Sequence, residues 1–189
     1  MLSETDRLTL LRIAREAVIA AAATHQPPPM LDLEALSPAL REPRASFVTL
    51  TDADGELRGC IGGLEARLPL ALDVQEHAAG SALNDPRFPP VTPNEVPTLH
   101  IEVSALTPPE PVPHRTPEEL LAALHPNVDG VILRSGQRRA TFLPQVWGKV
   151  PDPVRFLEML SEKMGASHSA WRSPAVEAWR YRVEIFEES

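Results

Sequence analysis

The sequence predicts an α+β fold built on a mostly antiparallel sheet with flanking helices. Stretches in which apolar and polar residues alternate recur with turn residues between them, which is typical of half-buried strands joined as hairpins. Stretches with apolar residues at helical spacing interrupt these strands, and this order favours helices beside an antiparallel sheet. The 21 prolines are dispersed among the patterned stretches, where a fixed φ angle and a missing N–H donor suit loops.

The chain begins with a predicted helix. Ser3 can cap its N-terminus, and Asp6 follows three residues later, as in a capping box. Apolar residues then recur at helical spacing along one face: Leu10, Ile13, Ala14, Ala17, Val18 and Ala21. We therefore expect this helix to pack against the core.

The next elements alternate between strand and helix patterns. Residues 45–62 alternate at period two on both sides of Asp52–Gly55, a turn composition, and predict a β-hairpin. Residues 69–84 start at a proline and predict a helix that ends before Pro86. Residues 98–106 alternate again and predict a strand.

The second half of the chain repeats this mixture. Residues 117–124 predict a short helix opened by Thr116, and residues 128–144 predict a second hairpin. Residues 153–165 predict a helix with a glycine stop, and residues 177–188 predict a final strand.

Composition excludes several classes of protein. A net charge of -8, from 26 acidic and 18 basic residues, repels phosphate backbones and argues against nucleic-acid binding. A single cysteine allows neither an internal disulfide nor a cysteine-rich zinc module and fits a reducing compartment, so we expect the cytoplasm. Charged residues throughout residues 1–23 argue against a signal peptide or a membrane span.

The register of the first hairpin decides what surrounds that cysteine, Cys60. A four-residue loop at the predicted turn would place Thr51 opposite Glu56. The two-residue alternation of a strand would then put Cys60 on the same face as Arg58 and close to Phe47.

Two interpretations of Cys60 are compatible with this arrangement. A nearby Arg58 favours the thiolate, which is the reactive form of cysteine, and Gly59 and Gly62 leave backbone uncovered for a ligand or another strand. Free cysteine is also among the most buried residue types, so Cys60 can be simple packing. We expect packing, with a side chain largely inaccessible to solvent.

His100 and Glu102 alternate with apolar residues in the strand 98–106, so that strand has one polar face. If this face adjoins Cys60 and Arg58, the sheet gathers the ingredients of an activated nucleophile. The alternative is the solvent side of a sheet, where such residues pair across strands. Two potential ligands without a third give no metal prediction, and we expect no cofactor.

Asp85 and Arg87 flank Pro86 directly after the predicted helix 69–84. They either hold the loop together by capping and pairing or project a carboxylate and a guanidinium into a binding site. His77, within that helix, follows apolar residues at helical spacing and is expected to be half-buried packing.

A two-residue turn at Gly136 and Gln137 would place Arg134 directly opposite Arg139 in the second hairpin. Like charges across a ladder are destabilising, so these arginines favour an anion close by. That anion can be a carboxylate of this chain, the acidic patch of a partner protein, or a small anionic ligand such as a phosphate.

Several stretches in a fixed order resemble the AMMECR-one domain family. They are LRGCIG (57–62), NDPRFPPVT (84–92), IEVSALTP (101–108), VDGVILRSGQRRATFLPQVW (128–147) and EKMG (162–165). The match spans nearly the whole chain, and bacterial and archaeal members are often called AmmeMemoRadiSam system protein A. The resemblance implies one AMMECR-one domain over residues 1–189, with a larger and a smaller lobe flanking a cleft.

The resemblance also implies partners, namely a Memo-type protein and a radical-SAM enzyme. This chain lacks the three-cysteine cluster of radical-SAM chemistry and cannot be that enzyme itself. We favour an accessory or binding module. The alternative is a small-molecule enzyme that uses the Cys60 thiolate, with His100 or Glu102 as base and Arg58 or Arg134 as anion anchor.

Overall fold

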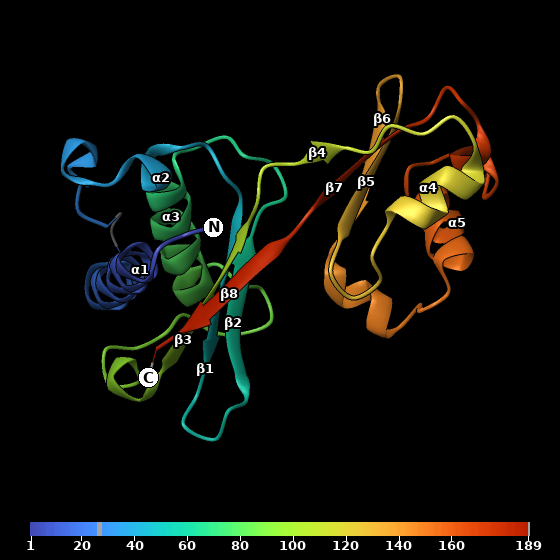
Figure 1. Ribbon diagram of the computed structural model, residues 1–189. Coiled ribbons are helices and arrows are strands. Elements are labelled where there is room, and N and C mark those ends of the chain that lie inside the picture. Colours follow the sequence, from blue (N-terminus) through green and yellow to red (C-terminus); the bar gives the residue numbers. More distant parts are fainter. Residues whose placement is uncertain (26–27, 189) are drawn as a thin grey trace. The chain divides into compact units, whose positions relative to one another are not determined.

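The structure is a computed structural model that describes residues 1–25 and 28–188. The chain forms two compact units, an N-terminal unit of Met1–Thr107 completed by the segment that starts at Glu184, and a second unit of Pro108–Val183. The expected α+β class is confirmed, although the strands form two four-stranded sheets rather than one (Figure 1).

The α-helices are α1 (Glu4–Thr24), α2 (Pro38–Arg41), α3 (Leu70–Leu83), α4 (Pro117–Ala123) and α5 (Pro153–Lys163). The strands are β1 (Ser46–Thr51), β2 (Leu57–Gly62), β3 (His100–Leu106), β4 (Glu110–Pro111), β5 (Gly130–Ser135), β6 (Arg138–Phe142), β7 (Glu177–Tyr181) and β8 (Val183–Glu187).

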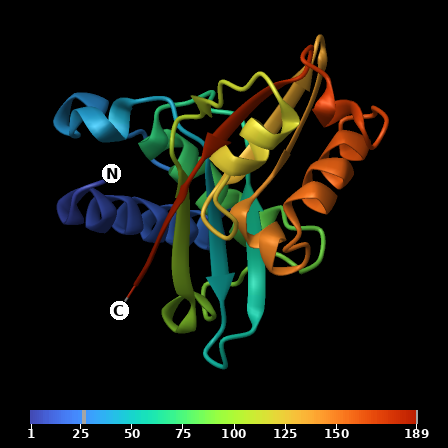
Figure 2. The ribbon, with the colours of Figure 1, turned by 45° about the vertical axis from the view of Figure 1, so that its right-hand side comes forward.

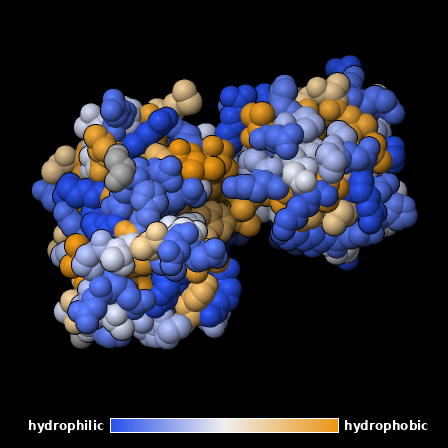
Figure 3. Space-filling view, turned by 90° about the horizontal axis from the view of Figure 1, so that it is seen from below, coloured by the Kyte–Doolittle hydropathy of each residue, from blue (hydrophilic) through white to orange (hydrophobic). Residues whose placement is uncertain are grey.

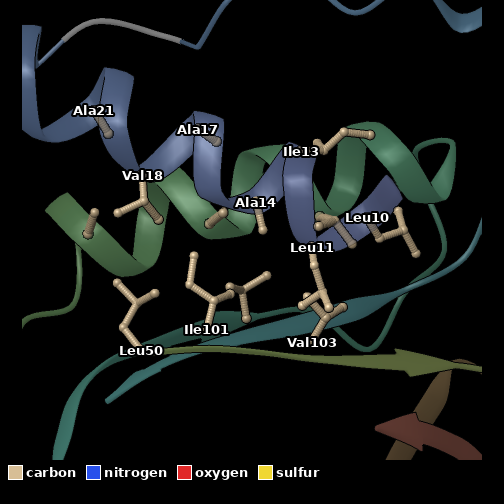
Figure 4. Packing of buried hydrophobic residues seen from close by; sticks show 14 of the residues in the cluster. Leu10, Leu11, Ile13, Ala14, Ala17, Val18, Ala21, Leu50, Ile101 and Val103 are labelled. Atoms are coloured by element: carbon tan, nitrogen blue, oxygen red, sulfur yellow. The ribbon is translucent and has the colours of Figure 1, made fainter. Parts of the chain in front are cut away.

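The N-terminal unit packs two helices on one face of a sheet with strand order β2-β1-β3-β8. Figure 4 shows α1 and α3 above this sheet, with Leu50, Ile101 and Val103 pointing up toward them. The predicted capping box of α1 is present, and every residue of its predicted apolar stripe is buried. The helix therefore packs as its sequence pattern predicts.

The first hairpin forms where predicted, but its predicted register is wrong. Thr51 pairs with Leu57 rather than with Glu56, so the loop has five residues, and the register shifts at a bulge between Leu50 and Thr51. Figure 2 shows this loop joining β1 and β2 at the foot of the view. The Asp52 carboxylate sets this loop, because it accepts hydrogen bonds from the N–H groups of Asp54 (3.0 Å) and Glu56 (2.9 Å).

The longer loop and the bulge each shift the pairing by one residue. Together they place Cys60 opposite Thr49, and Gly62 opposite Phe47. A shift by two residues preserves side-chain alternation, so Cys60 stays on the face that carries Phe47.

The second unit has its own sheet and its own core. Its strand order is β4-β7-β5-β6, and the two-residue turn of the second hairpin is confirmed by the pairing of Arg134 with Arg139. Helices α4 and α5 cover the face that carries Val131 and Leu133. In this core the indole of Trp147 stacks on the ring of Phe156 with 3.6 Å between ring centroids.

The predicted final strand 177–188 is divided in two at Arg182. β7 pairs with β5 in the sheet of the second unit, whereas β8 lies beside β3 in the sheet of the N-terminal unit. The alternating pattern continues through both pieces, because Ala178 belongs to one core and Phe186 packs against the other. The sequence pattern therefore contains no signal for the division.

Each unit buries its apolar residues in its own core and is mostly hydrophilic on its surface. In Figure 3 hydrophilic residues cover most of the visible surface of each unit, with smaller hydrophobic patches between them. Within residues 1–25 and 28–188, no helix is both long and apolar enough to span a lipid bilayer.

We predict that Gly130→Ala destabilises the second unit. The ring of Tyr181 lies directly over Gly130, and a Cβ there would overlap its carbon atoms. The expected loss is about 1–3 kcal/mol in the free energy of unfolding, measured by denaturant titration. Gly148→Ala is the control, because a Cβ at Gly148 meets no atom within 4 Å. Equal stability of the two variants would show that the Tyr181 ring does not require the glycine.

Candidate functional site

The sheet face opposite α1 and α3 gathers the polar residues that the sequence singles out. We call it the thiol face and define it by Phe47, Thr49, Cys60, Glu102 and Ile185. Thr49 pairs with Cys60 on one side and with Glu102 on the other, so these three side chains form a row across three strands. The Oγ1 hydroxyl of Thr49 lies 3.3 Å from the Sγ of Cys60 and donates to it.

Cys60 is half-buried, so its side chain is less enclosed than that of a core cysteine. The reason is its position on the sheet. Both long helices of the N-terminal unit pack on the opposite face, where the neighbouring residue Gly59 lies against Ser81 of α3. The thiol therefore keeps some contact with solvent.

Asp85 fixes the loop after α3 to the outer edge of β2. Its carboxylate is only 4 % exposed and accepts the backbone N–H of Cys60 at 2.8 Å. It also accepts the guanidinium of Arg87, with Nε to Oδ1 at 2.9 Å and Nη2 to Oδ2 at 2.6 Å. The Arg87 guanidinium and, more weakly, the Cys60 N–H hold the pKa of Asp85 far below its ordinary value, against the opposing effect of burial. Of the two predicted roles, the structure shows Asp85 holding the loop.

Arg58 is held by the same loop. Its Nε donates to Glu95 Oε1 at 2.8 Å, and its side chain is only 13 % exposed. The other oxygen of Glu95 accepts the N–H and the hydroxyl of Thr92, each at 2.8 Å. Arg58 first, and then the Thr92 donors, lower the pKa of Glu95 to about 2. A carboxylate of the chain thus already neutralises the predicted anion anchor.

The structure brings the predicted catalytic residues onto one face but not into contact. Glu102 lies two strands from Cys60, roughly 10 Å away at the usual spacing of strands. The Nε2 of His100 lies 3.3 Å from a carboxylate oxygen of Glu187. Burial, followed by the charge of Glu187, raises the pKa of Glu102.

Gly59 and Gly62 serve packing within the chain. A Cβ at Gly59 would overlap the carbonyl oxygen of Ser81, and a Cβ at Gly62 would overlap the ring of Phe47. The uncovered backbone that the sequence predicts is therefore approached by a helix and a phenylalanine ring of this chain.

Arg134 and Arg139 belong to the second unit and lie outside the thiol face. They are directly opposite each other, as predicted. The Nη2 of Arg134 lies 2.7 Å from Glu177, which is its partner on β7. A carboxylate of the chain thus already binds one edge of the Arg134 guanidinium.

Sequence reasoning missed a buried polar cluster on the helix side of the same sheet. The Asp73 Oδ2 accepts the hydroxyl of Ser46 at 2.6 Å and lies 3.1 Å from His77 Nδ1. His77 is half-buried as expected, and the carboxylate also fixes the orientation of its ring. The i,i+4 spacing of Asp73 and His77 on a predicted helix was the available signal.

The described part of the chain contains no group of three His, Cys, Asp or Glu side chains arranged to hold a metal ion. The thiol face therefore presents a half-buried thiol, a hydroxyl and a carboxylate, beside ion pairs that fix the neighbouring loop.

Comparisons with known proteins agree with this fold. The family model described as AMMECR1 matches residues 11–186. A protein of Thermofilum pendens is 39% identical over 205 residues, covering 100% of this chain and 92% of that protein. A protein of Methanothermobacter thermautotrophicus is 37% identical, with coverage of 99% and 96%. The crystal structure of the uncharacterized protein PH0010 from Pyrococcus horikoshii has a TM-score of 0.72 and 34% identity, covering 95% of this chain and 90% of that one.

We predict that Asp85→Asn destabilises the protein at neutral pH. The variant loses the ion pair with Arg87 and weakens the hydrogen bond to the N–H of Cys60, at an expected cost of about 1–3 kcal/mol in the free energy of unfolding. Because the pKa of Asp85 is lowered by folding, the charged carboxylate stabilises the native state at neutral pH, and this contribution is lost as the pH falls.

The difference between wild type and Asp85→Asn should therefore shrink between about pH 5 and pH 1, measured by denaturant unfolding at a series of pH values. Asp54→Asn is the matched control, since Asp54 is an exposed aspartate of the β1–β2 loop. A difference that stays constant with pH would contradict this assignment to Asp85.

Proposed function

Because the chain belongs to the AMMECR1 family, we propose that it is an accessory binding module whose recognition surface is the thiol face. The partners in this proposal are the Memo-type protein and the radical-SAM enzyme that the family resemblance implies. The observation that carries this proposal is that the charged side chains around Cys60 are paired with one another.

The candidate base His100 and the arginines near the thiol are engaged in ion pairs of their own. His100 lies against Glu187, and Arg58 and Arg87 are bound by Glu95 and Asp85. A nucleophile needs a base within hydrogen-bonding distance, and Glu102 is two strands away from Cys60. Such an arrangement supports recognition better than catalysis.

The same ion pairs make the surface rigid before any partner arrives. The loop 85–95 is fixed at Asp85 through the backbone of β2 and at Glu95 through Arg58. A surface ordered in advance loses less conformational entropy on binding.

Ile185 supplies an apolar contact for a partner on this face. Its neighbours in β8 point the other way, since Glu184 binds the buried Arg44 and Phe186 packs against the core. Alternation therefore puts Ile185 on the thiol face, where it is 52% exposed. An apolar contact beside polar side chains is common in protein interfaces.

We predict that Ile185→Arg weakens capture of the Memo-type or radical-SAM partner about tenfold, because it places a charge where apolar contact is expected. The measurement is a titration of the immobilised full chain with each purified partner from the same genome. Leu8→Arg is the matched control, since Leu8 is 62% exposed on α1, away from the thiol face. Equal capture of the partner by both variants would contradict the assignment of the thiol face as the recognition surface.

One observation favours the alternative, an enzyme that uses the Cys60 thiolate. The hydroxyl of Thr49 donates to Sγ and so holds the thiol in a defined orientation on the thiol face. The substrate in that case would be a small electrophile able to reach a half-buried thiol.

We predict that native Cys60 reacts with iodoacetamide at pH 7 more slowly than the same cysteine in the unfolded chain, because it is half-buried and lacks a base within reach. Mass spectrometry of the alkylated protein gives both rates. Native reaction faster than unfolded, with a clear loss in Thr49→Val, would favour the thiol enzyme over the binding module.

A further inference from the structure

A groove of about 340 Å³ lies on the sheet of the second unit. We call it the arginine groove, and it is lined by Pro109, Ile132, Arg134, Arg139 and Trp179. Ile132 and Arg134 alternate with the core residues Val131 and Leu133 of β5, so the groove lies on the face opposite the α4–α5 core. Its volume is in the usual range of small-molecule sites.

Arg134 is held in a defined position at this groove. Its guanidinium carbon lies 5.0 Å from the centroid of the Trp179 ring. Its Nε and Nη2 both bind a single oxygen of Glu177, at 2.8 and 2.7 Å. A guanidinium has five N–H donors, so this ion pair leaves Arg134 with donors for a further anion.

Arg139 brings a second guanidinium to the same place. It is the direct cross-strand partner of Arg134, and side chains in such positions have Cβ atoms roughly 5 Å apart. Two cations this close stabilise a shared anion bound between them, and guanidinium groups bind carboxylate or phosphate oxygens in pairs.

The rest of the groove is apolar and partly aromatic. Ile132 is the cross-strand partner of Trp179 and is 3% exposed, while the indole of Trp179 is half-exposed. Pro109 completes the lining. A planar ring can lie against the indole and the proline while its anionic group reaches the two arginines.

We propose that the arginine groove binds a small ligand consisting of a planar ring with one carboxylate or phosphate group. The groove belongs to the second unit, whereas the thiol face belongs to the N-terminal unit. This proposal therefore uses no residue of the thiol face, and the two proposals can fail separately.

The experiment is an NMR titration of the full chain with phenyl phosphate and, separately, with benzoate, observed at the indole N–H signals of its three tryptophans. Trp147 and Trp171 are fully buried, and Trp179 alone lines the groove. Trp179→Phe assigns the reporting signal. The expected result is a saturable shift of the Trp179 signal, with both other indole signals unchanged.

Isothermal titration calorimetry then measures affinity for whichever probe binds. Arg134→Gln and Arg139→Gln are each expected to weaken binding about tenfold, because each removes charge-assisted hydrogen bonds. Trp179→Leu should also weaken binding, because it removes the ring contact. Arg138→Gln is the control, since Arg138 lies in the same hairpin but donates to the carbonyl of Gly165 at 2.8 Å. Near-UV circular dichroism checks that each variant is folded.

Three results would overturn the proposal. They are an unresponsive Trp179 signal, unchanged affinity in the folded Arg134→Gln and Arg139→Gln variants, and binding of inorganic phosphate as tight as that of phenyl phosphate. The last result would show that the planar ring contributes nothing. A probe preference between phenyl phosphate and benzoate identifies which anionic group the arginines select.

Discussion

Asp85 carries a charge with almost no access to water, so its partners must come from the protein. It finds them in the N–H of Cys60 and in Arg87, one on an edge strand and one on the loop that covers this edge. Moving the loop away would break the hydrogen bond between Asp85 and the N–H of Cys60 and would uncover this strand edge. The position of the loop beside Cys60 depends on this one group.

Local signals in the sequence were sufficient for the elements of the fold. Ser3 and Asp6 cap α1, Thr116 caps α4, and the periods of 3.6 and 2 distinguish helices from strands. The register of β1 and β2 was beyond these signals, since it depends on how the carboxylate of Asp52 binds the N–H groups of its own loop. The division of the last strand likewise depends on two separate cores, which no local pattern encodes.

The sequence was sufficient to predict which residues belong to the candidate site, but not which charged side chains pair with each other. Alternation correctly predicts that Cys60 and Glu102 lie on polar strand faces. Which charges meet is decided by residues far apart in the chain: Glu95 is 37 residues from Arg58, Glu177 is 43 from Arg134, and Glu187 is 87 from His100. One sequence without tertiary contacts cannot choose among 26 acidic residues, whereas the structure shows that Glu95 pairs with Arg58 and Glu177 with Arg134.

The position of β8 has a consequence for synthesis and folding. This strand follows every other strand in sequence, yet it completes the sheet of the N-terminal unit, and its Glu184 binds both Arg44 and the N–H of Leu2, 182 residues away. During translation, the strands of the second unit, β4 to β7, are synthesised before residues 183–187 emerge from the ribosome. The unit that is translated first is therefore the one whose sheet is finished last, and its high contact order favours slow closure of that sheet.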